Sequence, residues 1–300
     1  MSVIRKFAYF CLETFINFKI ILVSSRIRKK PLKYGLNTDE REIKIIISLT
    51  SYPARFPTLD ITIRSLLNQT MKPDKMLLFL HEDGEYKEVT PNIKELEKYG
   101  LEIVPCGENL RPHKKYFYAM QKYPDDIIIT VDDDENYNPR LVETLHESYK
   151  RFPKAVSAAK ARKIRFDENG NPLPYKKWRR PLLRKWLQAN KNNLPPQSSL
   201  FAVGVGGILY PPHCMDKSLL FNVEKIKEIC FKADDMWLKA VQLKSGTKVA
   251  IIPQHKNFPY RPVGSQKAAL HRGNVGKNEN DVYINNIIKE FNFTAADFKD

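Results

Sequence analysis

Cysteine is scarce in this sequence, and no stretch of it stays apolar for long. The 300 residues include four widely separated cysteines, none in a CxxC pair or at metal-ligand spacing from a histidine: Cys11, Cys106, Cys214 and Cys230. This pattern argues against a disulfide-stapled secreted fold and a Cys/His zinc site, and it favours a reduced, cytoplasmic chain. Within residues 3–24, the longest uncharged apolar run is Phe7 to Leu12, far shorter than the roughly 20 residues that span a bilayer.

Internal repeats and the glycine signatures of common nucleotide sites are also missing. The segment Gly204–Gly207 has neither the GxGxxG spacing nor the lysine of a P-loop. Hydrophobic residues make up 42% of the chain and aromatic residues 11%, which excludes a disordered or low-complexity protein. We therefore expect a globular α/β chain that fills this length as one unit.

Acidic residues are outnumbered, and the formal net charge is +16. Such an excess favours anionic partners such as phosphates, acidic sugars or anionic lipid. Residues 160–185 hold ten basic and two acidic residues, half of the excess. This run is either a solvated face or a binding surface. Two tryptophans, Trp178 inside it and Trp186 directly after it, favour a surface that binds an anionic acceptor, with Trp178, Arg179 and Arg180 as acceptor contacts.

The N-terminal segment is apolar but interrupted by charge. Residues 3–24 are rich in Val, Ile, Phe and Leu, and a basic block follows at Arg26, Arg28, Lys29, Lys30 and Lys33. We expect a helix that lies on a membrane surface, with the basic block on anionic headgroups. An apolar helix packed on the protein's own core and a poorly formed membrane span are the alternatives. The expected division is a membrane-associating segment over 1–33 and a catalytic domain over 34–300.

Apolar runs and helical patterns alternate along the chain. Strands are expected at 44–49, 75–80, 101–104, 126–131, 155–159, 206–210 and 248–252, and helices at 57–69, 92–99, 113–122, 139–152, 234–244 and 282–291. The first 135 residues alternate regularly between the two, which predicts a mostly parallel central sheet with helices on both faces. Ligands of such sheets bind beyond the carboxyl ends of the strands.

Three consecutive aspartates, Asp132, Asp133 and Asp134, follow the apolar strand expected at 126–131. Adjacent carboxylates repel one another and are costly to desolvate, so a buried strand that ends in three of them needs a cation there. Oxygen ligands suit Mg²⁺ or Mn²⁺. A solvated acidic turn is the alternative. We predict a divalent metal site at Asp132 and Asp134.

These residues resemble a known family. An apolar strand followed by Asp132–Asp134 is similar to the DxD motif of GT-A glycosyltransferases. The opening KIIISLTSYPAR and the later RSLLNQT resemble the start of family-two-like bacterial transferases, which include enzymes of capsule and lipopolysaccharide synthesis. The segment His113–Tyr116 resembles their donor-binding segment. The resemblance covers about residues 42–285, with a donor half over 42–135 and an acceptor half over 136–285, and it implies a GT-A (Rossmann-like) fold.

The resemblance also assigns roles to residues. It implies that Asp132 and Asp134 hold the metal, and that Asp132 and Asp133 contact the donor. The loop after the first strand would contact the donor's base, ribose or phosphate through Thr50, Ser51, Tyr52 and Arg55. The donor residues expected outside this loop are Asp83, Lys114 and Lys115. A glycine loop at Gly206 and Gly207 would meet the acceptor, because glycine permits close backbone approach. A tight turn is the structural alternative for these glycines.

An acidic pair, Asp234–Asp235, opens the helix expected at 234–244. Acids at a helix start can simply complement the helix dipole. An inverting transferase, however, needs a carboxylate that takes the proton of the acceptor hydroxyl. Similar transferases usually carry Glu-Asp here and use the second acid. We therefore predict Asp235 as the general base, with Asp234 as the alternative.

The predicted activity is a metal-dependent transfer of sugar from a nucleotide-sugar, expected to be a UDP-sugar, to a glycan or lipid-linked acceptor in cell-surface polysaccharide synthesis. Inversion is expected, and a retaining transferase is the nearest alternative. A nucleotidyltransferase would carry a glycine-rich loop in place of TSYPAR. A non-enzymatic membrane- or nucleic-acid-binding module would not explain a strand that ends in three aspartates. No nucleic-acid partner is expected, and the expected location is cytoplasmic, peripheral on the inner face of the membrane.

Overall fold

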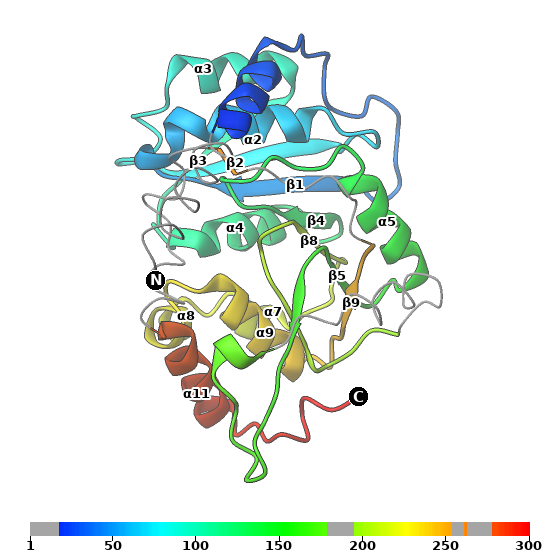
Figure 1. Cartoon of the computed structure of the whole chain (residues 1–300), viewed down its shortest axis with the longest axis vertical. Coiled ribbons are helices and arrows are strands. Elements are labelled where there is room, and N and C mark those ends of the chain that lie inside the picture. Colours follow the sequence, from blue (N-terminus) through cyan, green and yellow to red (C-terminus); the bar gives the residue numbers. More distant parts are fainter. Residues whose placement is uncertain (1–17, 179–194, 254–260, 263–277) are drawn as a thin grey trace, which may run out of the picture.

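A seven-stranded sheet forms the centre of the computed structural model, which describes residues 18–178, 195–253, 261–262 and 278–300 (Figure 1). The strand order is β3-β2-β1-β4-β8-β5-β9. The bounds are β1 (Ile45–Thr50), β2 (Lys75–His81), β3 (Leu101–Cys106), β4 (Ile127–Thr130), β5 (Val156–Ala158), β8 (Ile208–Tyr210) and β9 (Val249–Ile251). All seven strands lie in segments where the sequence predicts them, which confirms the α/β class.

The sheet is parallel except at β8. Strands β1 to β4 run parallel, with Ile46 opposite Ile128 of β4 and Lys75 of β2. Strand β8 runs antiparallel to both β4 and β5, and β5 pairs parallel with β9. The mostly parallel sheet expected from the sequence is therefore confirmed. Strands β1 and β4 are buried on both faces, which explains their unbroken runs of isoleucine.

Helices cover the two faces of the sheet and form a separate core on each. One face packs against α2 (Phe56–Leu67), α3 (Pro91–Lys94) and α5 (Leu141–Arg151). The other packs against α4 (Lys114–Lys122), α9 (Asp234–Lys244) and α11 (Glu279–Phe291). In Figure 1, α2 and α3 lie above the sheet, and α4, α9 and α11 lie below it.

Several small elements were not predicted. Strands β6 (Ala161–Lys163) and β7 (Leu200–Ala202) form an antiparallel pair, and α7 (Lys217–Leu220) and α8 (Val223–Ile229) precede α9. Residues 164–174 extend from the end of β6 and reverse direction near Gly170-Asn171. The Asp167 carboxylate accepts backbone hydrogen bonds from Asn169 and Asn171 and holds that turn.

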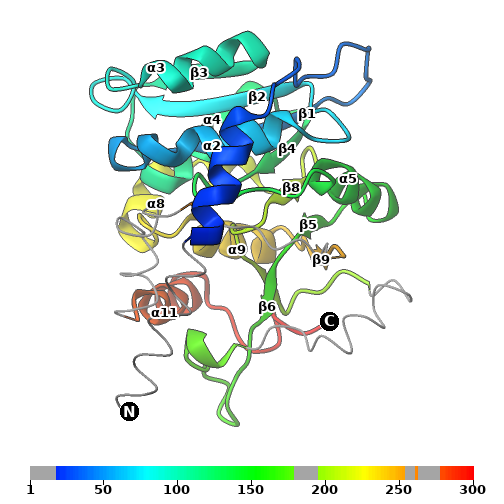
Figure 2. The same ribbon diagram turned by 45° about the horizontal axis from the view of Figure 1, so that its top comes forward.

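Residues 18–29 form a helix that lies against α2, in dark blue in front of α2 in Figure 2. Arg28 donates to both carboxylate oxygens of Asp60, at 2.7 and 2.8 Å, and to the Pro57 carbonyl at 2.8 Å. Residues 1–17, the first part of the predicted membrane-associating segment, lie outside the described residues. Among the helices that are described, none is long and apolar enough to cross a bilayer.

Candidate active site

The three aspartates leave the sheet directly after β4, and hydrogen bonds fix their backbone. The Asp132 N–H donates to the Tyr137 hydroxyl at 2.8 Å, and that hydroxyl donates back to the Asp132 carbonyl. The Thr62 hydroxyl on α2 donates to the Asp133 carbonyl at 3.0 Å. The carboxylates are therefore held at the carboxyl edge of the sheet, where ligands of parallel sheets bind.

Lys115 joins this acidic turn to the acidic pair of α9. Its ammonium lies 2.8 Å from Oδ1 of Asp132 and 2.9 Å from Oδ2 of Asp234. Lys115 is buried in the first turn of α4, and the charges of the two aspartates outweigh its burial and hold its pKa well above the ordinary value. Two acidic motifs about 100 residues apart in the sequence therefore share one buried cation.

Asp235 lies beside this pair and faces Gly204. The Gly204 N–H donates to its Oδ2 at 2.9 Å, while its buried Oδ1 has no hydrogen-bond partner among the described residues. A Cβ atom at Gly204 would lie only 3.2 Å from Oδ1 of both Asp132 and Asp235. Glycine at this position therefore lets the backbone approach both carboxylates. Burial and the charge of Asp234 raise the pKa of Asp235 well above its ordinary value.

Arg55 and Ser51 hold the other two aspartates of the turn. The Arg55 guanidinium donates to Asp134 at 3.1 Å and lies 4.0 Å from Asp133, whose carboxylate also accepts from the Ser51 hydroxyl at 2.6 Å. Burial nevertheless raises the pKa of Asp133 to about 6. For Asp132, the Lys115 ammonium outweighs burial, and the pKa is lowered. The neighbouring cations therefore favour the ionised form of Asp132 more than that of Asp133.

These groups line one cavity of about 580 Å³, a size typical of small-molecule sites. Most of the predicted donor, metal and catalytic residues lie on its wall: Thr50, Ser51, Tyr52, Arg55, Lys114, Lys115, Asp132, Asp133, Asp134, Asp234 and Asp235. Loop 50–55, the start of α4, the aspartate turn and the start of α9 meet here. The structure therefore brings together residues that the sequence places in four separate segments.

Other predicted residues lie elsewhere. Asp83 is outside the cavity wall, with a side chain that is 77% exposed and 3.7 Å from Lys87. Gly206 and Gly207 also lie outside it. Both have positive φ, and Cβ atoms there would meet Ala159 and Leu141, so their backbone conformation and local packing account for glycine.

Trp178 is buried in a small aromatic cluster. Its indole N–H donates to the Leu173 carbonyl at 2.7 Å, and its ring packs against Tyr175 and Phe201. It does not line the cavity, whereas Tyr175 and Phe201 do. Arg179, Arg180 and Trp186 lie outside the described residues.

The cavity wall also includes residues outside the predicted donor, metal, catalytic and acceptor sets. Glu85 takes the position expected of Asp83: its carboxylate accepts the His81 N–H at 2.8 Å and pairs with Lys114. Asn109 and Arg261 lie on the wall as well, and Arg261 donates to the buried Glu135 at 2.7 Å. Glu135 extends the aspartate run by one acid, and that run is the sequence signal for it.

The aspartate turn suits a hard divalent cation in its chemistry. It offers carboxylate oxygens only, Asp133 is held as a poorly compensated acid, and a buried oxygen of Glu135 has no hydrogen-bond partner within the described chain. A cation at Asp132 and Asp134 would compete with Lys115 and Arg55 for them. Among the described residues, no three metal-ligating side chains are already arranged as a site.

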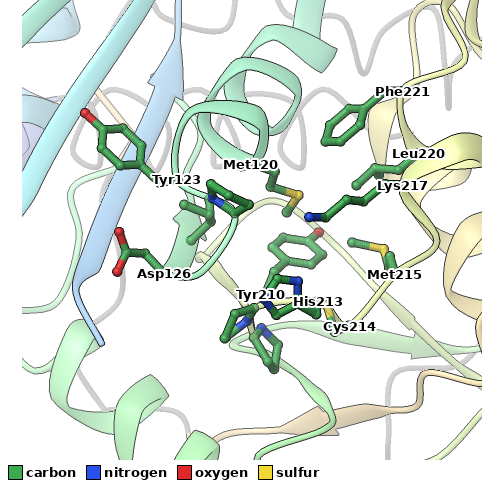
Figure 3. Close-up of a pocket in the computed structure, with 14 residues that line it drawn as sticks. Met120, Tyr123, Asp126, Tyr210, His213, Cys214, Met215, Lys217, Leu220 and Phe221 are labelled. Carbon is green, nitrogen blue, oxygen red and sulfur yellow. The ribbon is translucent and has the colours of Figure 1, made fainter. Parts of the chain in front are cut away.

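A second hollow, drawn in Figure 3, is too small to hold a nucleotide-sugar. Its volume is about 30 Å³, and it lies where Asp126 before β4, the end of α4 and the segment after β8 meet. Tyr210 lies at its centre, near Met120, Met215 and Lys217.

The family-level comparison agrees with this geometry. Residues 46–206 match the family described as "Glycosyl transferase family 2". No curated protein matches the sequence. Among solved structures, the mannosyltransferase PcManGT from Pyrobaculum calidifontis, in complex with GDP-Man and Mn²⁺, is similar over 98% of this chain and 77% of its own, with a TM-score of 0.52 and 13% identity. At that identity the likeness concerns the fold. A CMP:2-keto-3-deoxy-manno-octonic acid synthetase complexed with CTP matches over 80% of this chain and 100% of its own, with a TM-score of 0.41 and 12% identity.

Proposed function

This chain belongs to glycosyl transferase family 2, and on that premise we propose that it transfers sugar with inversion from a nucleotide-sugar to a hydroxyl of a glycan or lipid-linked acceptor. The observation that carries the proposal is the single cavity in which Lys115 joins Asp132 of the aspartate turn to Asp234 of the acidic pair. An inverting displacement needs a group that stabilises the leaving diphosphate and another that removes a proton. This cavity holds candidates for both.

The donor would lie along loop 50–55 and the start of α4. Arg55 is buried and offers a planar guanidinium suited to phosphate oxygens, and Lys114 and Asn109 lie further along the same wall. Glu85 forms an ion pair with Lys114 on this wall. It would take the role predicted for Asp83, which is contact with the donor's base. We propose UDP-sugars as the donors to test first.

Asp132 and Asp134, with Asp133 beside them, are the residues that would hold a Mn²⁺ or Mg²⁺ ion. Bound there, the ion would neutralise the charge that grows on the leaving nucleoside diphosphate. Lys115 and Arg55 already lie against these carboxylates, so they would remain as cations near the same phosphates.

Asp235 is the proposed general base. The acceptor oxygen attacks the anomeric carbon, the bond from that carbon to the donor phosphate breaks, and the hydroxyl proton passes to Asp235. Its Oδ2 is anchored by the Gly204 N–H, which leaves the unpartnered Oδ1 for the acceptor hydroxyl. The raised pKa strengthens this oxygen as a base once it is ionised.

The acceptor would rest on the wall formed by Tyr175, Phe201 and Val203, near Lys232. The Tyr175 N–H donates to the Asp281 carboxylate of α11 at 2.5 Å, which fixes this wall to the C-terminal helix. An aromatic ring beside a lysine suits an acidic or phosphorylated sugar. We propose such an acceptor, as expected in cell-surface polysaccharide synthesis such as that of capsule or lipopolysaccharide.

The test is donor hydrolysis across UDP-, GDP- and CMP-sugars with Mn²⁺, followed by NMR of the product's anomeric proton. One nucleotide class should be hydrolysed far faster than the others, and the product should have the inverted configuration. Absence of hydrolysis of every donor would contradict the transferase activity. Retention of configuration would contradict the inverting mechanism and the role of Asp235.

A further inference from the structure

We propose that the helix at residues 18–29 docks the protein on an anionic lipid surface. Three of the six large hydrophobic side chains exposed in the described chain lie on this one helix: Phe18 is 58% exposed, Ile21 53% and Leu22 42%. The spacing i, i+3, i+4 puts them on one face, and Lys29 lies further along it. Arg26 borders the same face and is exposed, as is Lys33 after the helix.

The opposite face of the helix lies toward the protein. Ile20, Val23 and Ile27 are half-buried. Arg28 lies seven residues after Ile21, at the border of the two faces, and its long side chain reaches back to both oxygens of Asp60, which is only 3% exposed, and to the Pro57 carbonyl. The two alternatives that the sequence left open, packing on the domain and contact with a membrane, are therefore compatible, because they use different faces of one helix.

Charge selects the partner for the outer face. Residues 18–33 contain six basic residues and no acidic one. A second copy of this chain would bring the same positive charge, and a nucleic acid would leave the three apolar side chains exposed to water. An anionic lipid surface satisfies both features, because apolar side chains enter the headgroup region while lysine and arginine meet the phosphates.

The docking point lies next to the proposed active site. Pro57 and Asp60 lie in the first two turns of α2, which begins directly after Arg55 of the cavity wall. A membrane-bound helix would hold that wall near the lipid surface. This consequence rests on the proposed function, because a lipid-linked acceptor would then be presented at the site.

The experiment is co-sedimentation of the full chain with vesicles, without any donor. Vesicles of phosphatidylcholine alone are compared with vesicles that also contain phosphatidylglycerol. The wild type should bind the anionic vesicles more tightly, and added salt should weaken that binding. Replacing Arg26, Lys29 and Lys33 with Gln should weaken it by roughly a hundred-fold. Replacing Phe18, Ile21 and Leu22 with Ser should weaken it by about ten-fold or more.

Control variants carry basic-to-Gln or apolar-to-Ser changes on other exposed surfaces. Lys94, Lys98 and Lys248 changed to Gln, and Tyr86 and Val282 changed to Ser, should bind like the wild type. Thermal unfolding confirms that each variant is folded. Equal binding to both vesicle types, no binding, or unchanged binding by the helix variants would overturn the proposal. Self-association lost in the Ser variant, without vesicle binding, would assign the surface to a second copy instead. If the wild type binds anionic vesicles as expected but hydrolyses no donor in the separate activity assay, the result counts against the proposed function and not against this surface.

Discussion

Changing Asp235 to Asn is expected to stop sugar transfer while leaving the protein folded and more stable near neutral pH. The substitution keeps the size of the side chain, and the amide oxygen can still accept the Gly204 N–H. It removes the proposed general base. Loss of a general base costs about 10²–10⁴ in rate, which corresponds to about 3–5 kcal/mol in the activation barrier. Donor affinity should change little, because the proposed partner of Asp235 is the acceptor hydroxyl and not the diphosphate.

The stability effect has a sign that follows from the raised pKa. Burial and the Asp234 charge make the ionised form of Asp235 unfavourable in the folded state. The folded protein therefore binds this proton more tightly than the unfolded chain. Ionised Asp235 begins to destabilise the fold as the pH rises above the ordinary carboxyl value, and fully does so above the raised pKa. Asn carries no such cost, so its Tm should exceed that of the wild type at about pH 7 and approach it at about pH 4.

The neighbouring change of Asp234 to Asn is the matched control. Asp234 shares the Lys115 ammonium with Asp132, so its loss leaves a buried cation with one carboxylate instead of two. Removal of one partner from a buried charged group costs about 1–3 kcal/mol or more. This variant should therefore lose stability, measured by chemical denaturation, whereas the Asp235 variant gains it.

The pH dependence of the wild type supplies an independent measurement. If Asp235 must be ionised to act, kcat/KM rises about ten-fold per pH unit below its raised pKa and then levels off. This rise should lie above the ordinary carboxyl range, at a lower pH than in the metal-free protein because the bound cation favours the ionised form, and it should be absent from the residual activity of the Asn variant. An Asn variant that keeps more than about a tenth of wild-type kcat would refute the reasoning. A less stable Asn variant at pH 7 would refute the argument about its pKa.

Three further outcomes are expected. EDTA should abolish donor turnover, Mn²⁺ or Mg²⁺ should restore it, and Asp134→Ala should lack activity while circular dichroism shows a folded protein; full activity in EDTA would contradict the metal site. Lys115→Met should lower the free energy of unfolding in urea by about 3–5 kcal/mol, because it leaves two buried carboxylates without their cation; a loss below about 1 kcal/mol would show that the bridge is not structural. Arg28→Ala should cost about 1–3 kcal/mol by leaving the buried Asp60 unpaired, while Lys30→Ala, which breaks only an exposed hydrogen bond, should cost less than about 0.5 kcal/mol.

The sheet and its functional edge were predictable because their signals are local. A parallel strand buried on both faces needs an unbroken apolar run, and β1 and β4 show such runs directly in the sequence. The aspartates follow one of these runs, so their place at the carboxyl edge follows from strand direction alone. The antiparallel insertion of β8 between β4 and β5 has no comparable signal, because a three-residue apolar strand does not encode its direction.

Residues placed by loops and packing were harder to predict. Asp83 and Glu85 stand two positions apart after β2, and only the turn that brings Glu85 back to the His81 N–H decides which one meets the cavity. Trp178 lies in a basic run that favours exposure, yet its indole N–H finds a carbonyl partner and its ring enters the core. Composition predicts a surface in that region, and side-chain packing decides which residues form it.

The arrangement around Lys115 links the two halves of the proposed reaction. One buried ammonium holds Asp132 on the donor side and Asp234 on the base side, and Gly204 brings Asp132 and Asp235 close together. The cavity therefore gathers several carboxylates around Lys115, Arg55 and Arg261, and burial together with the charge of the neighbouring acids raises the pKa values of Asp133 and Asp235. A cation at the aspartate turn would reduce that repulsion. By the same electrostatic argument it would lower the pKa of Asp235 and favour the ionised base when the metal and donor are in place.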